Sequence, residues 1–436
     1  MQPEQEHDHP APVSTATSPL GVPDSLTVRS EAAAAVGAAL LAGGMASFRV
    51  KAAMAVVARA LGLDSFRAIV TFTDITATAT LGGRYRTRIT QPEHVGVDVD
   101  HLARIHRMVE DLPERVEAAE VFERLAVIAA RPPLHSAVVN ALAAGLACAA
   151  FSFLNRGGPT EMVCVLIAAT LGQALRRALQ RRQWNHLLIT VLAATLTSIV
   201  YALTIAAGTR WGVVGPGHEG GYLAAMLFLV PGFPMITGIL DIVRSDFSAG
   251  VARLTYSAMI VLAAAASVWT VSVVVGITPG MPPGAEVPFV LDLVLRALAT
   301  FVGVLGFAVI FNSPWGIALG AAAVSMVANT LRLAMIDSGA PAQLATLVAT
   351  CLVGALAYLV ARLTHIPRTT ISVPAVVIMI PGFTLSMAFA LMNSGDVTGA
   401  LVLAQEAVQV ILAAGLGLAL AHLATSPAWR RVTQPH

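Results

Sequence analysis

Leu229-Val230-Pro231-Gly232-Phe233 and Ile380-Pro381-Gly382-Phe383 each interrupt a long apolar run of the chain. In both copies an aspartate, Asp246 or Asp396, follows the proline by fifteen residues, so the copies align without a gap at an offset of 150. Proline and glycine inside a membrane helix free backbone groups that hydrocarbon cannot satisfy, so such breaks persist where protein or a water-filled cavity supplies partners. Matching breaks in two halves of a membrane chain indicate a substrate site of a transporter.

The composition is that of a membrane protein. Of 436 residues, 56% are hydrophobic and 12% charged, against about 25% charged in an ordinary soluble domain. A formal net charge of +2 predicts no nucleic-acid partner. The three cysteines, Cys148, Cys164 and Cys351, lie in apolar runs and are expected to be small buried hydrophobes.

Charge is distributed unevenly along the chain, and this predicts five segments. We expect a disordered tail over residues 1–29, without a cleaved signal peptide. A cytoplasmic α+β domain over residues 30–131 is expected next. Two membrane modules, 132–280 and 281–426, and a cytoplasmic tail, 427–436, complete the predicted order.

The predicted cytoplasmic domain combines helical and strand patterns. Residues 30–61 are rich in alanine and indicate a helix interrupted at Gly43-Gly44. Segments 66–74 and 84–90 alternate as strands around Gly82-Gly83, and Val99 to Glu110 indicates a further helix.

The remainder is predicted to be mainly α, with ten transmembrane helices of about 20 apolar residues each. The predicted spans are approximately 134–154, 161–179, 187–207, 221–242, 250–276, 288–311, 314–335, 341–361, 371–393 and 398–422.

Arginine placement predicts the orientation, because short cytoplasmic loops retain positive charge. With the N-terminal domain inside, three arginines fall outside: Arg156, Arg210 and Arg332. Ten fall inside: Arg176, Arg177, Arg181, Arg182, Arg244, Arg253, Arg362, Arg368, Arg430 and Arg431. We therefore expect a multi-pass protein of the bacterial cytoplasmic membrane with both termini in the cytoplasm.

Five helices per half is an odd number, so a duplicated unit enters the membrane in opposite orientations. The prediction is two inverted five-helix repeats. Asp246, after the fourth span, then falls on the cytoplasmic side and Asp396, after the ninth, on the outer side, with the two breaks near the midplane.

The breaks themselves are the candidate substrate site. Broken helices expose main-chain groups and half-helix dipoles, so a carboxylate can bind at a helix N-terminus. The alternative is a pair of packing kinks. The predicted substrate-binding residues are Pro231, Gly232, Phe233, Pro381, Gly382 and Phe383.

Three aspartates near the breaks are candidates for coupling or gating. Asp246 and Asp396 each open a turn into a helix, where an aspartate also serves as an N-cap, and both roles are compatible. Asp241 has no acidic counterpart in the second half, because Leu391 stands at that position.

Glu406 lies about nine residues into the tenth predicted span. A charged carboxyl group at that depth in the membrane is costly, so its presence there predicts a functional role. It is the candidate proton carrier, and a protonated structural glutamate is the alternative. Asp292 and Arg296 stand four residues apart on the sixth span and are expected to form a structural ion pair.

No catalytic, metal or cofactor site is predicted. His94, Asp98, Asp100, His101 and His106 cluster in the sequence, but His101 and His106 are five apart rather than the four that place two ligands on one helix face. No phosphate-binding loop ends in Lys-Ser or Lys-Thr, so direct drive by ATP is unsupported. Ser47 and Ser65 are lone residues, expected on a helix surface and in a turn.

These residues resemble the threonine/serine exporter family over nearly the whole chain after about residue 30. The resemblance rests on three stretches: Leu40-Leu41-Ala42-Gly43-Gly44 with Arg49-Val50 and Ala60-Leu61-Gly62-Leu63, Pro231-Gly232-Phe233-Pro234 with Asp241 and Asp246, and Pro381-Gly382-Phe383. It implies a cytoplasmic domain joined to ten membrane helices in two modules. It also implies a secondary exporter of threonine and serine, driven by the membrane potential or the proton gradient.

Two alternatives remain open. Family relatives that divide the modules between two chains imply dicarboxylate export, for which only Arg296 offers a cation near the midplane. A membrane sensor or enzyme that acts through its N-terminal domain is the other alternative, but ten helices exceed what an anchor requires. The expected partners are a small amino acid, protons, the lipid bilayer and a second copy in a homo-oligomer.

Overall fold

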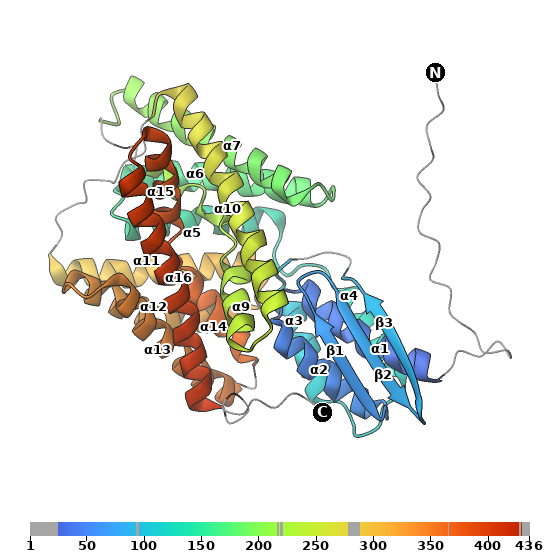
Figure 1. The fold of residues 1–436 in the computed structure, drawn as a ribbon. Helices are drawn as coiled ribbons and strands as arrows, with labels where there is room; N and C mark the ends of the chain where they lie inside the picture. The colour runs from blue at the N-terminus through green and yellow to red at the C-terminus, as the bar shows by residue number, and fades with distance from the viewer. Residues whose placement is uncertain are drawn as a thin grey trace, which may run out of the picture.

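The computed structural model describes residues 25–92, 96–215, 218, 221–277, 288–364, 366–426 and 429. The chain forms an N-terminal α+β domain beside a larger bundle of helices (Figure 1). The predicted tail thus lies outside the described residues up to position 24, whereas Ser25 to Arg29 belong to the first helix. The predicted C-terminal tail is also outside them, except for Trp429.

The N-terminal domain is built on a three-stranded antiparallel sheet in the order β1-β2-β3. Its strands are β1 (Ser65–Val70), β2 (Ile75–Leu81) and β3 (Arg84–Thr90), with Ser65 opposite Thr80 and Ile75 opposite Thr90. The hairpin between β2 and β3 turns at Gly82 and Gly83, whose φ angles of 58° and 77° suit glycine. Its helices are α1 (Ser25–Ala42), α2 (Ser47–Ala60), α3 (Val99–Glu110) and α4 (Ala118–Ala129).

The prediction of one strand over 66–74 is wrong, because a four-residue turn ends β1 and a second strand follows. In this turn the Thr71 N–H donates to the Asp74 carbonyl (2.8 Å), and the Asp74 N–H donates to Thr71 Oγ1 (3.0 Å). The short polar side chains stabilise the reversal locally. The register that follows places Ile75, Ala77 and Ala79 on the buried face of β2.

Helix α1 is long and apolar enough to cross a membrane, yet it packs on the sheet. Arg86 of β3 donates to Thr27 Oγ1 (2.9 Å), and Arg88 pairs with Glu31. The interruption at Gly43-Gly44 is confirmed, and Gly44 has a φ of 92° that a larger residue adopts only with strain. Figure 1 shows α1 and α2 against the sheet, with α3 on the side of the bundle.

The prediction of ten membrane spans is confirmed by length and composition within the described residues. Nine spans after α1 are long and apolar enough to cross a membrane, namely eight unbroken helices and the span Arg368–Ser394. The helix pair Gly221–Leu229 and Gly232–Val243, bent by 62°, supplies the tenth. The unbroken helices are α5 (Ala137–Leu154), α6 (Pro159–Gln180), α7 (His186–Arg210), α10 (Phe247–Val275), α11 (Phe289–Ile310), α12 (Trp315–Asp337), α13 (Ala342–Thr364) and α16 (Val397–Thr425).

Both Pro-Gly-Phe stretches break their spans. In the first half the break separates α8 (Gly221–Ala224) and the 3-10 turn Leu227–Leu229 from α9 (Gly232–Val243). In the second half it separates α14 (Arg368–Val377) from α15 (Gly382–Ser394). Each half therefore contains five spans, of which the fourth is broken.

Small residues bring the bundle helices into close contact, as is usual where lipid supplies no hydrophobic drive between helices. A Cβ at Gly306 of α11 would lie 2.5 Å from the Ala143 carbonyl oxygen of α5. A Cβ at Gly417 of α16 would lie 2.1 Å from Thr350 Oγ1 of α13. These glycines allow α11 to approach α5 closely, and α16 to approach α13 closely.

We expect Gly306→Val to lower the thermal unfolding midpoint of the purified chain by several degrees. The larger side chain overlaps backbone of α5, and overpacking of this kind costs about 1–3 kcal/mol or more. Gly320→Val is the matched control, because a Cβ at Gly320 of α12 meets no atom within 4 Å. Equal midpoints for both variants would contradict close α5–α11 packing.

Candidate functional site

The two breaks have the same backbone geometry. Pro231 has φ −81° and ψ 61°, and Pro381 has φ −79° and ψ 54°. The Gly232 N–H donates to the Val230 carbonyl and the Gly382 N–H to the Ile380 carbonyl, each at 2.8 Å. These are inverse γ-turns centred on proline, and the chain enters a new helix directly after each.

The breaks pack against each other reciprocally. A Cβ at Gly232 would lie 2.7 Å from Ile380 and 3.1 Å from Val377. A Cβ at Gly382 would lie 3.0 Å from both Leu227 and Val230. Leu227 corresponds to Val377 and Val230 to Ile380 at the offset of 150, so each glycine contacts the equivalent residues of the other half.

A narrow apolar cleft of about 10 Å³, closed to an amino acid in this conformation, lies between the breaks. Both glycines line it, together with Phe151 of α5, Phe307 of α11 and the aliphatic residues that contact them. Helices α9 and α15 begin at these glycines, whose own N–H groups are taken by the γ-turns. Pro234 has no N–H, so the first-turn N–H groups without a partner inside the helix are those of Phe233, Phe383 and Thr384. Two positive half-helix ends therefore meet at the cleft, which favours a ligand with a negatively charged group.

The two phenylalanines of the motif do not line this cleft. Phe233 is buried against Phe311, with ring centroids 5.6 Å apart. A Cβ at Gly44 would lie 3.3 Å from its ring, so Phe233 faces the N-terminal domain. Phe383 is buried as well. Of the predicted substrate-binding residues, the two glycines line the cleft, whereas the prolines and the phenylalanines of the motif do not.

Helices α9 and α15 run in opposite directions from the breaks. Helix α9 ends at the N-terminal domain, where Asp241 accepts a hydrogen bond from the Ser47 N–H. Helix α14 begins at that same side, where Thr369 lies 4.0 Å from the Met45 sulfur. Its continuation, α15, therefore leads away from the domain.

Asp241 and Asp246 bind one loop of the N-terminal domain, Gly43–Ser47, which we call the docking loop. Ser47 donates to Asp241 Oδ1 through its N–H (2.8 Å) and lies within hydrogen-bond distance of it through Oγ (2.9 Å). The same hydroxyl lies 2.8 Å from Asp246 Oδ2, and Lys51 pairs with Asp246. Since a serine hydroxyl carries one proton, the two carboxylates share it.

Arg253 of α10 completes this contact from the membrane side. Its Nη2 donates to the Met45 carbonyl (2.7 Å), its Nη1 to the Gly44 carbonyl (3.4 Å), and its Nε lies 3.2 Å from Asp241 Oδ2. The side chains of Arg253 and Asp241 are 1% and 0% exposed. A buried pair of this kind is costly to break from one side, about 3–5 kcal/mol, because the remaining charge has no partner.

Asp396, the repeat counterpart of Asp246, has a different role. Its carboxylate accepts a hydrogen bond from the Gly399 N–H (2.9 Å) and caps α16. Asp246 makes no such cap on α10. Leu391 and Leu403 occupy the counterpart positions of Asp241 and Arg253, so these ionic contacts have no counterpart in the second half, which reaches the docking loop through Thr369 at Met45.

The remaining predicted residues lie apart from the breaks. Glu406 is half-buried on α16 and has no ion-pair partner within the described part of the chain. Arg296 lies 2.8 Å from Asp292 and also pairs with Asp337 of α12. No grouping of ligands suited to a metal occurs in the described residues, and His94 lies outside them.

The expectation that Ser47 lies on a helix surface is wrong, because Ser47 is fully buried at the docking contact. Ser65 lies in β1 rather than in a turn, with its hydroxyl 2.5 Å from that of Thr80. Sequence reasoning also missed Lys51, and it used Arg253 only to predict orientation. Lys51 pairs with a residue 195 positions away, and Arg253 donates to carbonyls 209 and 208 positions away, so no local pattern indicates these contacts.

Comparisons with known proteins agree with this architecture. The family model of the threonine/serine exporter, ThrE, matches residues 31–275, and a second model, "Threonine/Serine exporter, ThrE", matches residues 296–424. The first match alone spans more than half of the chain. No solved structure matches.

Two curated relatives carry the name "Probable succinate transporter subunit YjjP". The protein of Klebsiella aerogenes is 25% identical over 210 residues, and that of Escherichia coli K12 is 27% identical over 211 residues. Each alignment covers 47% of this chain and 78% of the relative. Family and relatives are named for transport rather than for catalysis. With its two matched modules and ten apolar spans, this multi-pass membrane protein belongs to the threonine/serine exporter family.

Proposed function

We propose that the chain is a secondary active exporter of small hydroxylated amino acids, chiefly threonine and serine. The observation that carries the proposal is the reciprocal contact of the two breaks, where two half-helix N-termini meet at one cleft. The carboxylate of an amino acid suits these helix ends. Its small side chain suits the apolar walls.

Transport proceeds by alternating access between two inverted five-helix repeats in this proposal. Five spans per half and the opposite directions of α9 and α15 support the inversion. The proposed modules are 132–280 and 281–426, behind a cytoplasmic domain over residues 30–131. In a bacterial inner membrane with both termini in the cytoplasm, rocking of the modules about the breaks exposes the cleft to each side in turn.

Asp241 and Asp246 serve as the cytoplasmic gate in this scheme. They hold the docking loop against the ends of α9 and α10. Opening toward the cytoplasm then requires the docking loop to leave Arg253 and both carboxylates. Glu406, a carboxyl group on a membrane helix, is the proposed proton carrier.

Export of a dicarboxylate such as succinate is the second candidate. The relatives named for succinate transport favour it, as do the two converging helix ends. The cleft residues supply neither a cation for a second carboxylate nor an anion for the ammonium group of an amino acid. The match to the threonine/serine exporter models, rather than the cleft, ranks the first candidate higher.

Efflux from preloaded cells that lack their own exporters tests the substrate and the drive. We expect the chain to export threonine and serine and an uncoupler to abolish this efflux. Glu406→Gln is expected to abolish coupled efflux, whereas Gln405→Leu, at an exposed neighbour on the same helix, retains it. Succinate efflux without amino-acid efflux would contradict the first candidate and favour the second.

Gly382→Ala tests the cleft. Its new methyl group would lie 3.0 Å from Leu227 and Val230, so we expect efflux to fall at least tenfold at equal protein levels. Gly320→Ala, in open space on α12, is the control. Full activity of Gly382→Ala would place the substrate elsewhere.

Ser47→Ala tests the gate. Loss of hydroxyl contacts to charged groups is worth about 1.5–3 kcal/mol each, so we expect amide hydrogen exchange in the docking loop to accelerate at least tenfold. Ser65→Ala removes a hydroxyl contact inside the same domain and leaves the docking contact intact. Unchanged exchange in Ser47→Ala would show that these contacts do not hold the loop.

A further inference from the structure

A second group of side chains joins the N-terminal domain to the bundle, and it is cationic. Arg49 comes from α2, Arg244 follows the last residue of α9, and Arg368 is the first residue of α14. His422, near the end of α16, completes this group, which we call the junction cluster.

Two aromatic rings contact three members of the junction cluster, Arg49, Arg244 and His422. Phe48 and Trp429 pack edge to face with centroids 5.3 Å apart. The Arg244 guanidinium carbon lies 5.8 Å from the Phe48 ring and 5.1 Å from the Trp429 ring, and that of Arg49 lies 5.7 Å from Phe48. His422 lies 4.7 Å from Trp429 by ring centroids.

Buried polar atoms of the junction cluster lack partners. In the described part of the chain, no hydrogen bond reaches Nε of Arg49, Arg244 or Arg368, or Nε2 of His422. Arg368 donates to Thr425 Oγ1 and the Gly354 carbonyl, each at 2.9 Å, and both acceptors are neutral. Buried donors are ordinarily bonded, whereas these four atoms are not, although the three arginine side chains as a whole are half-buried.

Among the described residues, no carboxylate lies within ion-pair distance of Arg49, Arg244 or Arg368. Burial, together with the charge of nearby Arg368, lowers the pKa of Arg49 to about 10. An arginine whose strongest electrostatic neighbour is another arginine lacks a counter-ion.

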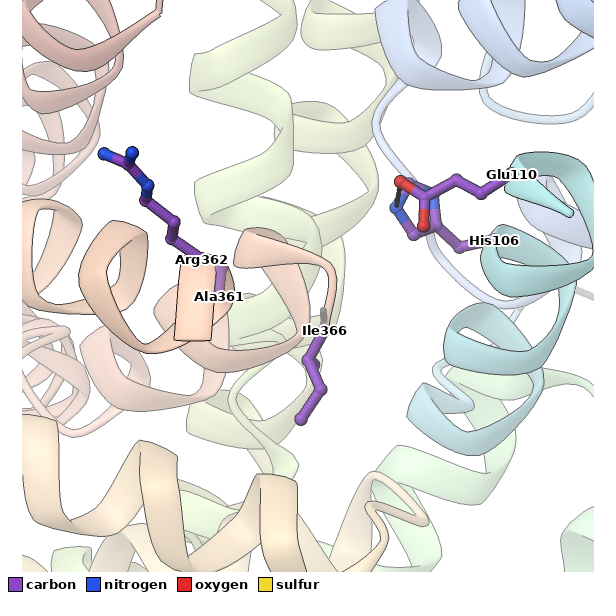
Figure 2. Close-up of a pocket in the computed structure, with 5 residues that line it drawn as sticks. All are labelled: His106, Glu110, Ala361, Arg362 and Ile366. Carbon is purple, nitrogen blue, oxygen red and sulfur yellow. Dashed lines mark ion pairs between the residues drawn. The ribbon is translucent and has the colours of Figure 1, made fainter. Parts of the chain in front are cut away.

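A cavity also opens between the N-terminal domain and the bundle, and no member of the junction cluster lines it. A cavity of about 240 Å³ opens between α3 and the turn from α13 to α14, lined by His106, Glu110, Ala361, Arg362 and Ile366. Figure 2 shows His106 and Glu110 together on one wall and Ile366 across the gap, with Arg362 directed away from them. Glu110 is engaged by His106 at 3.0 Å. Burial lowers the pKa of His106, Glu110 opposes this, and the charge of Arg49 adds to the lowering.

We propose that the junction cluster binds a phosphate-bearing anion that joins the N-terminal domain to the membrane bundle. Guanidinium groups match phosphate oxygens in geometry and charge. Three arginines from three elements suit a tetrahedral group with several acceptor oxygens better than one planar carboxylate. Because Arg49 belongs to the domain and the other members to the bundle, the anion stabilises the docked state.

The phosphate has two possible sources, a soluble phosphate compound or the headgroup of an anionic lipid at the ends of the membrane helices. Thermal unfolding of the purified full chain in lipid nanodiscs separates them. One arm adds inorganic phosphate or pyrophosphate to phosphatidylcholine nanodiscs, with chloride at equal ionic strength as reference. The other arm replaces part of the phosphatidylcholine by phosphatidylglycerol without added phosphate.

We expect one of these additions to raise the unfolding midpoint by several degrees, since a ligand that binds only the folded state stabilises it. The rise should disappear in Arg49→Gln and Arg368→Gln and persist in Arg59→Gln, an exposed arginine on the same helix as Arg49. A rise with phosphate identifies a soluble ligand, and a rise with phosphatidylglycerol alone identifies a lipid.

No rise in either arm would overturn the proposal, as would an equal rise in the parent chain and in both cluster variants. Two variants guard against a folding defect in one of them. Without any anionic addition, Arg49→Gln should unfold at or above the parent midpoint, because it removes an uncompensated buried charge. A lower midpoint for both variants under that condition would show that the arginines already have their partners and would also overturn the proposal.

Discussion

Hydrocarbon cannot satisfy a free backbone group, and this constraint determines where the chain can break its helices. The two Pro-Gly breaks meet each other in the protein interior, and each glycine packs on the aliphatic residues before the other break. Neither break can persist in this form alone, because its partner supplies the protein surface that covers it. The reciprocal contact explains why the two motifs share their sequence, their spacing and their backbone angles.

The two halves differ where the N-terminal domain binds. Asp246 and Asp396 occupy equivalent positions, yet Asp396 caps its own helix and Asp246 binds Ser47 and Lys51. Within the described residues, the position that serves as a helix cap in the second half thereby serves as a contact with the N-terminal domain in the first half. Such asymmetry suits a transporter whose two sides face different conditions, and it gives the N-terminal domain a physical route to the broken helix α9.

Much of the architecture was predictable because its signals are local. Long apolar runs locate the spans, Pro-Gly locates the breaks, and Gly43-Gly44 locates the end of α1. The turn that separates β1 from β2 was missed, since Thr71, Phe72 and Thr73 continue an alternating pattern up to Asp74. The docking contact was also out of reach, because the partners of Asp241 and Asp246 depend on how two separate parts of the chain meet in space.

The most direct test of this account is an experimental structure of the purified full chain at a saturating concentration of threonine. The account predicts density for the amino acid in the cleft between Gly232 and Gly382, with its carboxylate at the first N–H groups of α9 or α15. Threonine bound at a distance from both breaks, with the cleft closed by packed side chains, would contradict it.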